Sequence, residues 1–206
     1  MLIKRAFDFI SALIGLFVLS PVLISIALLI RIDSPGPALF VQDRVGKGGR
    51  LFRIFKFRTM TMGAEKKGQI TVGQDARVTR IGHGLRRLKL DELPQLLNVL
   101  RGEMSLVGPR PEVPRYVACY PQHVREMVLS VPPGITDWAS IEFKEESVLL
   151  GRASDPERTY VEEILPIKLE YYLRYVTQRN FVVDLKIIFL TLFAIAGHSE
   201  KVLLHK

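Results

Sequence analysis

The sequence predicts an α/β chain that is mainly helical and divided into two parts. Residues 9–30 form an uncharged apolar segment, and two runs of β-forming residues flank a glycine-rich turn at residues 46–49. The longer segments that follow are patterned as helices. We therefore expect a re-entrant membrane helix-break-helix at residues 1–32. Residues 33–206 should form a compact helical domain with a small β-hairpin or sheet and interfacial amphipathic helices.

The composition is that of a folded, basic chain. Its 206 residues are 48% hydrophobic, which is enough for a core, and they carry a formal charge of +8. This charge favours an anionic partner: nucleic acid, a phosphorylated metabolite or an acidic lipid headgroup. The single cysteine, Cys119, excludes an internal disulfide framework and a cysteine metal cluster, and we expect it to be buried.

Residues 9–30 match the length of about 20 residues that crosses the hydrocarbon of a bilayer. Pro21 lies at the middle of this segment and cannot donate a hydrogen bond to the Phe17 carbonyl. Ser20 can bond back toward Leu16 and widen the bend. A sharp kink is therefore expected here.

The flanks of this segment do not place its two ends on opposite sides of a membrane. Lys4 and Arg5 precede it and Arg31 follows it, so both flanks are basic. We interpret the segment as re-entrant, with both ends on the cytoplasmic side; a bent single span is the alternative. Asp8 is expected to pair with Arg31 or another interfacial cation, or else to lie at headgroup level.

A β-hairpin is expected around the turn at residues 46–49. Lys56 and Arg58, two residues apart on its second strand, should share a face and place two cations side by side. The alternative is a solvated basic strand face. Residues 61–82 are polar and contain glycine, so we expect a surface loop that leads into a helix around residues 83–90.

Further helices are expected at residues 93–100, 155–176 and 181–197, with a rigid turn at residues 130–136. Pro94 would occupy the first turn of its helix, where a missing N–H costs nothing. Asp155 and Pro156 mark the start of the next helix. The final segment contains Asp184 and Lys186 and is short for a span, so it should pack on the core or lie in the interface.

Asp91 and Glu92 are adjacent acids between a basic and an apolar run. On a helix they would point about 100° apart, so they cannot act as a face-to-face acid–base pair. At a helix start both should feel the positive end of the dipole and stay ionised. An ionised aspartate can attack phosphorus or carbon, and a neighbouring glutamate can bind Mg²⁺. The alternative is that Asp91 caps a helix and Glu92 only complements its dipole.

Arg110 lies between Pro109 and Pro111, which restrict the backbone around it. A guanidinium held on a stiff segment suits phosphate binding and the stabilisation of developing charge. Together with the two acids and the clustered Arg86 and Arg87, the pattern is typical of phosphoryl transfer. Beside a membrane-inserted helix, the acceptor should be a lipid.

Four ordered motifs follow the apolar helix with its Ser-Pro pair. They are KFRTM (56–60), RVTRIG (77–82), LRRLKLDELPQLLNVLRGEMSLVGPRPE (85–112) and PPGIT (132–136). In this order they resemble the bacterial sugar transferases, the small monotopic polyprenyl-phosphate phosphoglycosyl transferases, over nearly the whole chain. Larger members carry an added multi-span N-terminal region, and this chain resembles the minimal catalytic core.

The resemblance implies a Mg²⁺-dependent phosphoglycosyl transferase at the cytoplasmic face of the bacterial cytoplasmic (inner) membrane. Members of the family transfer a sugar-1-phosphate from a nucleotide diphosphate sugar, usually a UDP-sugar, to undecaprenyl or another polyprenyl phosphate. The products are a polyprenyl-diphosphate sugar and UMP, in the first membrane step of glycoconjugate or exopolysaccharide assembly. The resemblance does not decide the sugar, the pathway or whether the chain forms a homodimer.

The resemblance also implies roles for individual residues. Asp91 is similar to the nucleophile that carries a covalent phosphosugar, and Glu92 to the Mg²⁺ ligand. The candidate substrate-binding cations are Lys56, Arg58, Arg86, Arg87 and Arg110. Arg86 or Arg87 is expected to receive the lipid phosphate, and Asp155 is a supporting candidate. The chain departs from the family at residues 137–140, which read DWAS, and at Gly84; the first departure leaves the sugar or nucleotide contacts open.

Two other classes of protein would explain part of the sequence. A membrane-tethered nucleic-acid binder would account for the charge, but aromatics interleaved with basic residues and a recognisable motif are both lacking, so nucleic acid is not an expected partner. A non-catalytic membrane scaffold would account for the apolar helix and the basic residues. It would leave Asp91, Glu92 and Arg110 without a task.

Overall fold

The computed structural model describes residues 2–64, 68, 70–73 and 75–196. Its helices are α1 (Leu2–Asp33), α2 (Arg80–Arg87), α3 (Leu96–Arg101), α4 (Pro114–Val117), α5 (Gln122–Val128), α6 (Trp138–Glu142), α7 (Glu146–Leu150), α8 (Pro156–Thr159), α9 (Leu165–Gln178) and α10 (Phe181–Ile195). Shorter turns are the 3-10 segments η1 (Lys47–Gly49) and η3 (Leu90–Gln95) and the π-helical turn η4 (Tyr160–Ile164). The strands are β1 (Leu39–Val45), β2 (Leu51–Phe57), β3 (Ser105–Val107) and β4 (Gly134–Thr136). The chain is thus mainly helical with a small β part, as expected.

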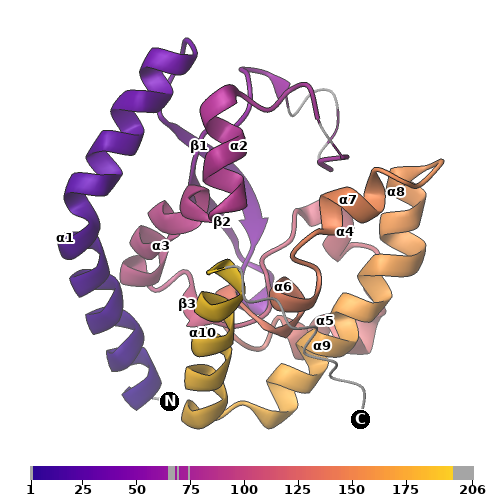
Figure 1. Ribbon diagram of the computed structural model, residues 1–206. Coiled ribbons are helices and arrows are strands. Elements are labelled where there is room, and N and C mark those ends of the chain that lie inside the picture. Colours follow the sequence, from indigo (N-terminus) through magenta and orange to yellow (C-terminus); the bar gives the residue numbers. More distant parts are fainter. Residues whose placement is uncertain (1, 65–67, 69, 74, 197–206) are drawn as a thin grey trace.

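Helix α1 is a single helix of 32 residues that bows along one flank of the molecule (Figure 1). It does not break at Ser20-Pro21, so the expected helix-break-helix is wrong at the level of secondary structure. The physical reason is local. Pro21 leaves the Phe17 carbonyl without its helical donor, and the Ser20 hydroxyl donates to that same carbonyl at 2.7 Å. Ser20 bonds to Phe17, not to Leu16 as expected.

The N-terminal end of α1 is attached to the domain by buried polar groups. Asp8 accepts hydrogen bonds from the Ser105 hydroxyl at 2.7 Å and from the Leu106 N–H at 3.3 Å. Lys4 forms an ion pair of 2.7 Å with Asp184 of α10. Asp8 does not pair with Arg31, because the two residues lie at opposite ends of one helix, but it does pair with another cation, Lys4, whose Nζ lies 3.8 Å from its carboxylate.

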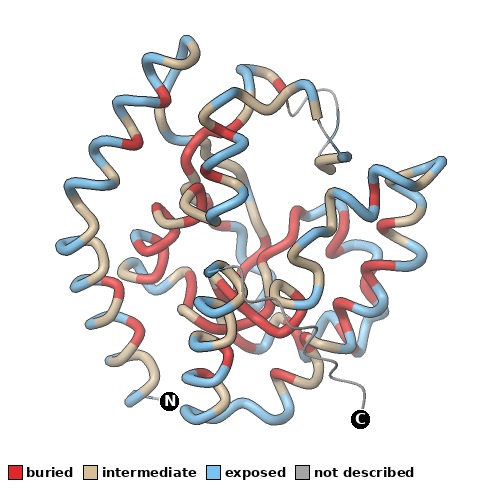
Figure 2. Tube along the Cα trace, in the orientation of Figure 1, coloured by how far each residue is buried: buried red, intermediate tan, exposed pale blue. Residues whose placement is uncertain are grey.

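The C-terminal end of α1 is attached to the same domain. Ile30 packs in a cluster with Phe57 and Leu85, and the Asp33 carboxylate accepts the Ile81 N–H at 3.2 Å. Between its ends, α1 contacts the domain at only a few positions, and most of its large apolar side chains point away from the domain. Figure 2 shows the long exposed stretches along this helix. Among the described residues, α1 is the helix long and apolar enough to cross a membrane.

The predicted hairpin is confirmed. Strands β1 and β2 are antiparallel, with Leu39 opposite Phe57 and Val45 opposite Leu51. Asn98 of α3, which is fully buried, accepts the Phe55 N–H at 3.0 Å and donates to the Arg53 carbonyl at 2.8 Å. This side chain joins the edge of β2 to the helix that follows η3, and so fixes the hairpin beside the paired acids.

A second, parallel pair of strands joins β3 to β4. The sequence predicts only a rigid turn at residues 130–136, and the strand within it was missed. The two backbones approach very closely: a Cβ on Gly134 would lie 2.1 Å from the Gly108 nitrogen, and a Cβ on Gly108 would lie 2.6 Å from the Pro132 carbonyl oxygen. Glycine is therefore required on both sides of this contact.

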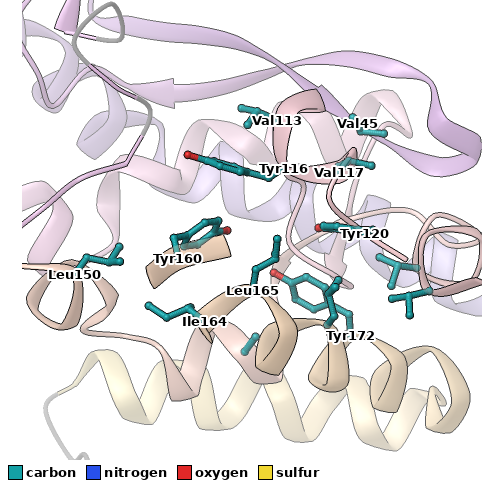
Figure 3. Close-up of a cluster of buried hydrophobic side chains, with 14 residues drawn as sticks. Val45, Val113, Tyr116, Val117, Tyr120, Leu150, Tyr160, Ile164, Leu165 and Tyr172 are labelled. Atoms are coloured by element: carbon teal, nitrogen blue, oxygen red, sulfur yellow. The ribbon is translucent and has the colours of Figure 1, made fainter. Parts of the chain in front are cut away.

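The largest hydrophobic cluster lies on the side of the molecule opposite α1. Figure 3 shows Val45 at the end of β1 and Tyr116 and Val117 of α4 facing Leu165 and Tyr172 of α9.

The helical run from α8 through η4 to α9 begins at the Asp155 cap, as predicted. The Asp155 carboxylate accepts the Arg158 N–H at 3.0 Å.

Helix α10 packs on the domain, in agreement with the sequence. Asp184 and Ile187 are buried, whereas Phe181, Val182 and Phe189 are exposed. Its N-terminal end lies beside that of α1 (Figure 1), where Phe7 and Phe181 form an edge-to-face aromatic pair. The two helices therefore present neighbouring apolar faces to the surroundings.

Candidate active site

The two adjacent acids lie in η3, a 3-10 turn that leads directly into α3. Pro94 is inside this turn, and the α-helix begins only at Leu96, later than predicted. The residue that caps η3 is Lys89, which has φ 56 and ψ 19. Asp91 is therefore not a helix cap. A left-handed backbone at a lysine is strained, and such strain is characteristic of sites where the chain must hold a particular geometry.

Glu92 is the centre of a buried ion cluster. Lys56 of β2 donates to Glu92 Oε1 at 2.9 Å, and Arg110 donates to Oε2 at 3.2 Å and also to Oε1. Arg110 thus binds the carboxylate with both terminal nitrogens, the bidentate geometry that favours arginine at such positions. The structure brings together Lys56, Glu92 and Arg110 from three segments that are far apart in the sequence.

Electrostatics divide the two acids. Burial alone would raise the pKa of Glu92, but Arg110 and Lys56 outweigh burial and hold this pKa well below its ordinary value. Burial and the neighbouring Glu92 raise the pKa of Asp91, and the opposing effects of Lys56 and Lys89 are smaller. Glu92 is therefore a permanent anion. The sequence predicted that a helix dipole would keep both acids ionised, yet for Asp91 the environment acts in the opposite direction.

Asp91 is only 9% exposed, and its Oδ1 atom is buried without a hydrogen-bond partner. A buried carboxylate oxygen that lacks a partner is costly and usually has a functional reason. The charged groups that act on it are Glu92, Lys56, Lys89 and Arg86. The oxygen is thus free to form a bond that the protein itself does not supply.

Arg110 is held by its backbone as well as by its side chain. Its N–H donates to Asp137 Oδ2 at 2.8 Å, and Asp137 Oδ1 accepts the Ser140 N–H at 2.5 Å. The preceding Pro109 carbonyl accepts the Gly134 N–H at 3.0 Å. The stiff segment predicted from the two prolines is therefore clamped on β4 and on the start of α6.

A polar cavity of about 450 Å³ opens beside this cluster. The predicted site residues Lys56, Arg86, Arg87 and Arg110 all line it, together with Lys89. Arg86 also donates to the Thr71 hydroxyl at 2.7 Å. The cavity is large enough for a nucleotide-sized anion, and its wall is rich in cations.

The far wall of the polar cavity is a second buried ion cluster. Glu112 accepts a hydrogen bond from the Tyr160 hydroxyl at 2.8 Å and lies 3.4 Å from Lys168. Lys168 also binds Glu146 at 3.0 Å. Burial would raise the pKa of Glu112, but Lys168 and Arg44 hold it below its ordinary value. The π-helical turn η4 places Tyr160 here, in keeping with the frequent presence of such turns at functional sites.

A separate, apolar groove of about 250 Å³ lies on the other side of the ion cluster. Its walls come from η3, α6 and α10, and include Glu92 and Arg110 at one end. Asp91 does not line either cavity. The arrangement is one cation-rich cavity and one apolar groove, with Glu92 and its two cationic partners between them.

A profile of the bacterial sugar transferase family matches residues 1–198. This chain belongs to the bacterial sugar transferases. A relative from Bacillus subtilis, an uncharacterized sugar transferase named EpsL, is 37% identical over 191 residues, which are 93% of this chain and 86% of the relative. The resemblance inferred from the motifs is confirmed.

Two other relatives have more specific names. The UDP-N-acetylgalactosamine-undecaprenyl-phosphate N-acetylgalactosaminephosphotransferase of Aeromonas hydrophila is 40% identical over 193 residues, 92% of this chain. The UDP-glucose:undecaprenyl-phosphate glucose-1-phosphate transferase of Escherichia coli K12 is 40% identical over 196 residues, 93% of this chain. The chain spans 43% of the length of the first and 40% of the second.

Not every predicted site residue of this sugar transferase joins the cluster. The Arg58 guanidinium donates to the carbonyls of Pro35 and Ser34, the latter at 2.8 Å, and so caps the end of α1. Lys56 and Arg58 thus bind different partners, Glu92 and the backbone at the end of α1. Asp155 is exposed and caps α8.

Several residues of the site were not found from the sequence. Lys89 and Lys144 line both cavities, and Asp137 holds the Arg110 backbone. A signal for Asp137 was present, since it begins the segment that departs from the family and has the position of a helix cap. No periodicity or spacing relates Lys144 to the acids.

The residues at η3 fit a Mg²⁺ ion that is shared with a substrate. Within the described ranges, no group of three or more His, Cys, Asp or Glu side chains gathers as a metal site. Mg²⁺ is often bound by one or two carboxylates together with substrate phosphates. Glu92 Oε2 accepts from one donor, so this oxygen keeps a lone pair for a metal.

Lys56 should titrate in an accessible pH range. Burial lowers its pKa from the ordinary 10.5 to about 8, although Glu92 opposes the shift. Between about pH 8 and 10.5 the unfolded chain binds more protons at this lysine than the folded chain, so its contribution to stability rises with pH across this window. NMR of protein with isotope-labelled lysine side chains should reveal one resonance that titrates near pH 8. The signal should vanish in Lys56→Gln, and titration of every lysine near 10.5 would contradict the assignment.

Proposed function

We propose that this sugar transferase moves a sugar-1-phosphate from a UDP-sugar to undecaprenyl phosphate or a related polyprenyl phosphate, in the first membrane step of glycoconjugate or exopolysaccharide assembly. The observation that carries the proposal is the unpartnered Asp91 Oδ1 beside Glu92, at the junction of a cationic cavity and an apolar groove. The names of two relatives, which include a UDP-sugar and undecaprenyl phosphate, support the same substrates.

In the first half-reaction the donor occupies the polar cavity, where cations neutralise its diphosphate. Asp91 Oδ1 attacks the sugar-bearing phosphorus; an O–P bond forms to the carboxylate, the bond to the bridging oxygen breaks, and UMP leaves with that oxygen. Arg110 and Lys56 are fixed before the substrate binds, so they stabilise the developing charge without reorganising. For this attack Asp91 has to turn from its buried position toward the cavity between Lys89 and Arg86.

In the second half-reaction an oxygen of the lipid phosphate attacks the same phosphorus. The new P–O bond gives the polyprenyl-diphosphate sugar, and the bond to Asp91 breaks to return a free carboxylate. One acid therefore serves both steps in a ping-pong scheme. The burial that raises the pKa of Asp91 also makes its carboxylate a more reactive nucleophile once it is ionised.

We assign Glu92 as the protein ligand of a Mg²⁺ ion. When bound, this ion would neutralise charge on the donor diphosphate. Glu92 is suited to the role because Arg110 and Lys56 hold its pKa well below the ordinary value, so that it is ionised at every working pH. The same two cations keep its carboxylate in one orientation.

We further propose that α1, although unbroken, keeps both of its ends on the cytoplasmic side, and that the domain lies at the cytoplasmic face of the bacterial inner membrane. Both ends of α1 are attached to the same domain, at Asp8 through Ser105 and at Asp33 through Ile81. A helix that crossed the membrane would place its ends on opposite sides, which these two attachments oppose. Its outward apolar side chains, with those of α10, would enter one leaflet.

Replacement of Asp91 by Asn should abolish turnover and leave the fold intact, because the amide has nearly the same volume but cannot form the acyl phosphate. We expect a loss of about 10³-fold or more in UMP release. The measurement is release of UMP from a panel of UDP-sugars with undecaprenyl phosphate present, together with trapping of labelled sugar phosphate on the protein. Asp155→Asn, an exposed helix cap, is the control and should behave as wild type. Wild-type transfer by the Asp91 variant would exclude it as the nucleophile.

Replacement of Glu92 by Gln should weaken the dependence on Mg²⁺, because the amide removes the charge that would bind the ion. We expect the Mg²⁺ concentration for half-maximal UMP release to rise about tenfold or more. Glu126→Gln on the exposed face of α5 provides the matched control. An unchanged Mg²⁺ titration in the Glu92 variant would count against its metal role.

A cysteine placed at Leu2 should react with a membrane-impermeant maleimide from the same side as Cys119. Cys119 was predicted to be buried but is exposed on the domain, so the native thiol reports the side on which the domain lies. The two positions are read separately by adding Leu2→Cys to a Cys119→Ser background and comparing it with the unmodified chain. Labelling of the two thiols from opposite sides would establish a single span.

A further inference from the structure

The polar cavity and the apolar groove are two separate spaces that share part of one wall. Lys89, Arg110, Ser140 and Lys144 line both of them. Lys56 lines only the polar cavity and Glu92 only the groove, and these two side chains are joined at 2.9 Å. The ion cluster is therefore the partition between the two spaces; Asp91 lines neither of them and has to turn to reach a group in either.

The groove differs from the polar cavity in chemistry. Away from the partition its walls are almost entirely aliphatic; they include Leu93, Leu96, Leu106, Ile135, Ile188 and Leu192. The Thr136 and Thr191 hydroxyls bond to one another at 2.7 Å, so they offer little to a polar ligand. A sugar or a nucleotide would lose its hydrogen bonds with water in such a space, whereas a hydrocarbon chain would gain from burial.

The groove is lined by three cations, Lys89, Arg110 and Lys144, and Arg110 binds Glu92 of the partition. The Lys144 Nζ atom donates to the Ala194 carbonyl near the end of α10 at 2.5 Å, and both residues line the groove. A ligand that suits this space has an anionic head, which the cations bind, and a hydrocarbon body, which packs on the aliphatic walls.

The outer wall of the groove is α10, whose other side chains continue the exposed apolar surface next to α1. Leu192 lines the groove and is 63% exposed, and Phe189, one turn before it, is 67% exposed. A chain that leaves the groove over α10 therefore enters an apolar surface and not a polar one. This continuity suits a ligand whose remaining length lies in a bilayer.

We propose that the groove between η3, α6 and α10 binds the first isoprene units of the polyprenyl phosphate acceptor, with its phosphate at Lys144 and Lys89. The inference rests on the proposed function and adds to it a separate site for the acceptor. Lys144 exchanges the Ala194 carbonyl for the lipid phosphate. The UDP-sugar then approaches Asp91 from the polar cavity, and the lipid phosphate approaches from the groove, on the other side of the Glu92 partition.

This arrangement makes the two half-reactions separable. Formation of the phosphosugar on Asp91 with release of UMP uses the polar cavity. Its discharge, in which a lipid phosphate oxygen bonds to phosphorus and the bond to Asp91 breaks, uses the groove. A change confined to the groove should therefore slow the second step and leave the first as it was.

The experiment fills the groove with Leu192→Trp and compares it with Leu185→Trp. Leu185 lies seven residues earlier, about two turns along the same side of α10, and is 43% exposed but outside the groove. In detergent micelles, each protein is mixed with the UDP-sugar that wild type accepts, and the UMP burst without acceptor is measured. Undecaprenyl phosphate is then added, and discharge of the labelled phosphosugar is followed.

For Leu192→Trp we expect a normal burst and a discharge slowed about tenfold or more. Lys144→Gln is the second variant, and should raise the undecaprenyl phosphate concentration needed for half-maximal discharge. Leu185→Trp should match wild type in both steps. Farnesyl phosphate, whose short chain still supplies the first isoprene units, should show the same slowed discharge with Leu192→Trp.

Three results would overturn either the acceptor groove or the proposed function. Equal discharge by Leu192→Trp and Leu185→Trp would overturn the acceptor groove, and so would loss of the burst in Leu192→Trp, which would make the groove part of the donor site. Absence of a burst in wild type with every UDP-sugar tested would instead overturn the proposed function.

Discussion

The ion cluster of Glu92 with Arg110 and Lys56 is the interaction on which the site depends. It joins η3 and the segment after β3 to strand β2, which Asn98 also joins to α3. Burying one charge alone would be strongly unfavourable, and the cost is offset only when all three side chains are present in good geometry. The cluster therefore specifies one arrangement of three segments, and it does so at the boundary between the polar cavity and the apolar groove. The cluster is stable only when all three side chains are present, and no single ion pair accounts for it.

Several unusual backbone features follow from that requirement. Lys89, which caps η3 just before the two acids, has a positive φ. Gly108 and Gly134 allow the β3 and β4 backbones to touch, which places the Pro-Arg-Pro segment over the acids. Asp137 then binds the Arg110 N–H. Each feature is locally unfavourable or restrictive, and together they fix one guanidinium. A preorganised cation of this kind is what phosphoryl transfer needs, since charge develops faster than a protein can rearrange.

Those parts of the fold that depend on local sequence signals could be predicted. Three features were predicted from the sequence: the hairpin around residues 46–49, the helix start at Asp155 and the packed apolar helix at the C-terminal end. Each depends on a turn, a cap or a pattern within a few residues. The uninterrupted course of α1 was not predicted, since it depends on the Ser20 hydroxyl reaching the one carbonyl that Pro21 leaves free. The β3–β4 pair was also missed, because three-residue parallel strands are formed by a partner far along the chain and leave almost no local pattern.

For the site, the sequence by itself determined the family and singled out the candidate residues. The adjacent acids, the arginine between two prolines and the basic residues before them are near one another along the chain and stay so in any fold. Only the tertiary structure decided which cations meet the acids. Lys56 binds Glu92 while Arg58, two residues on, caps α1, and Lys144 reaches the groove from the turn between α6 and α7. The reason is physical. Bonded neighbours are fixed by covalent geometry, whereas a contact between distant residues depends on how every intervening element packs, and no spacing in the sequence records that.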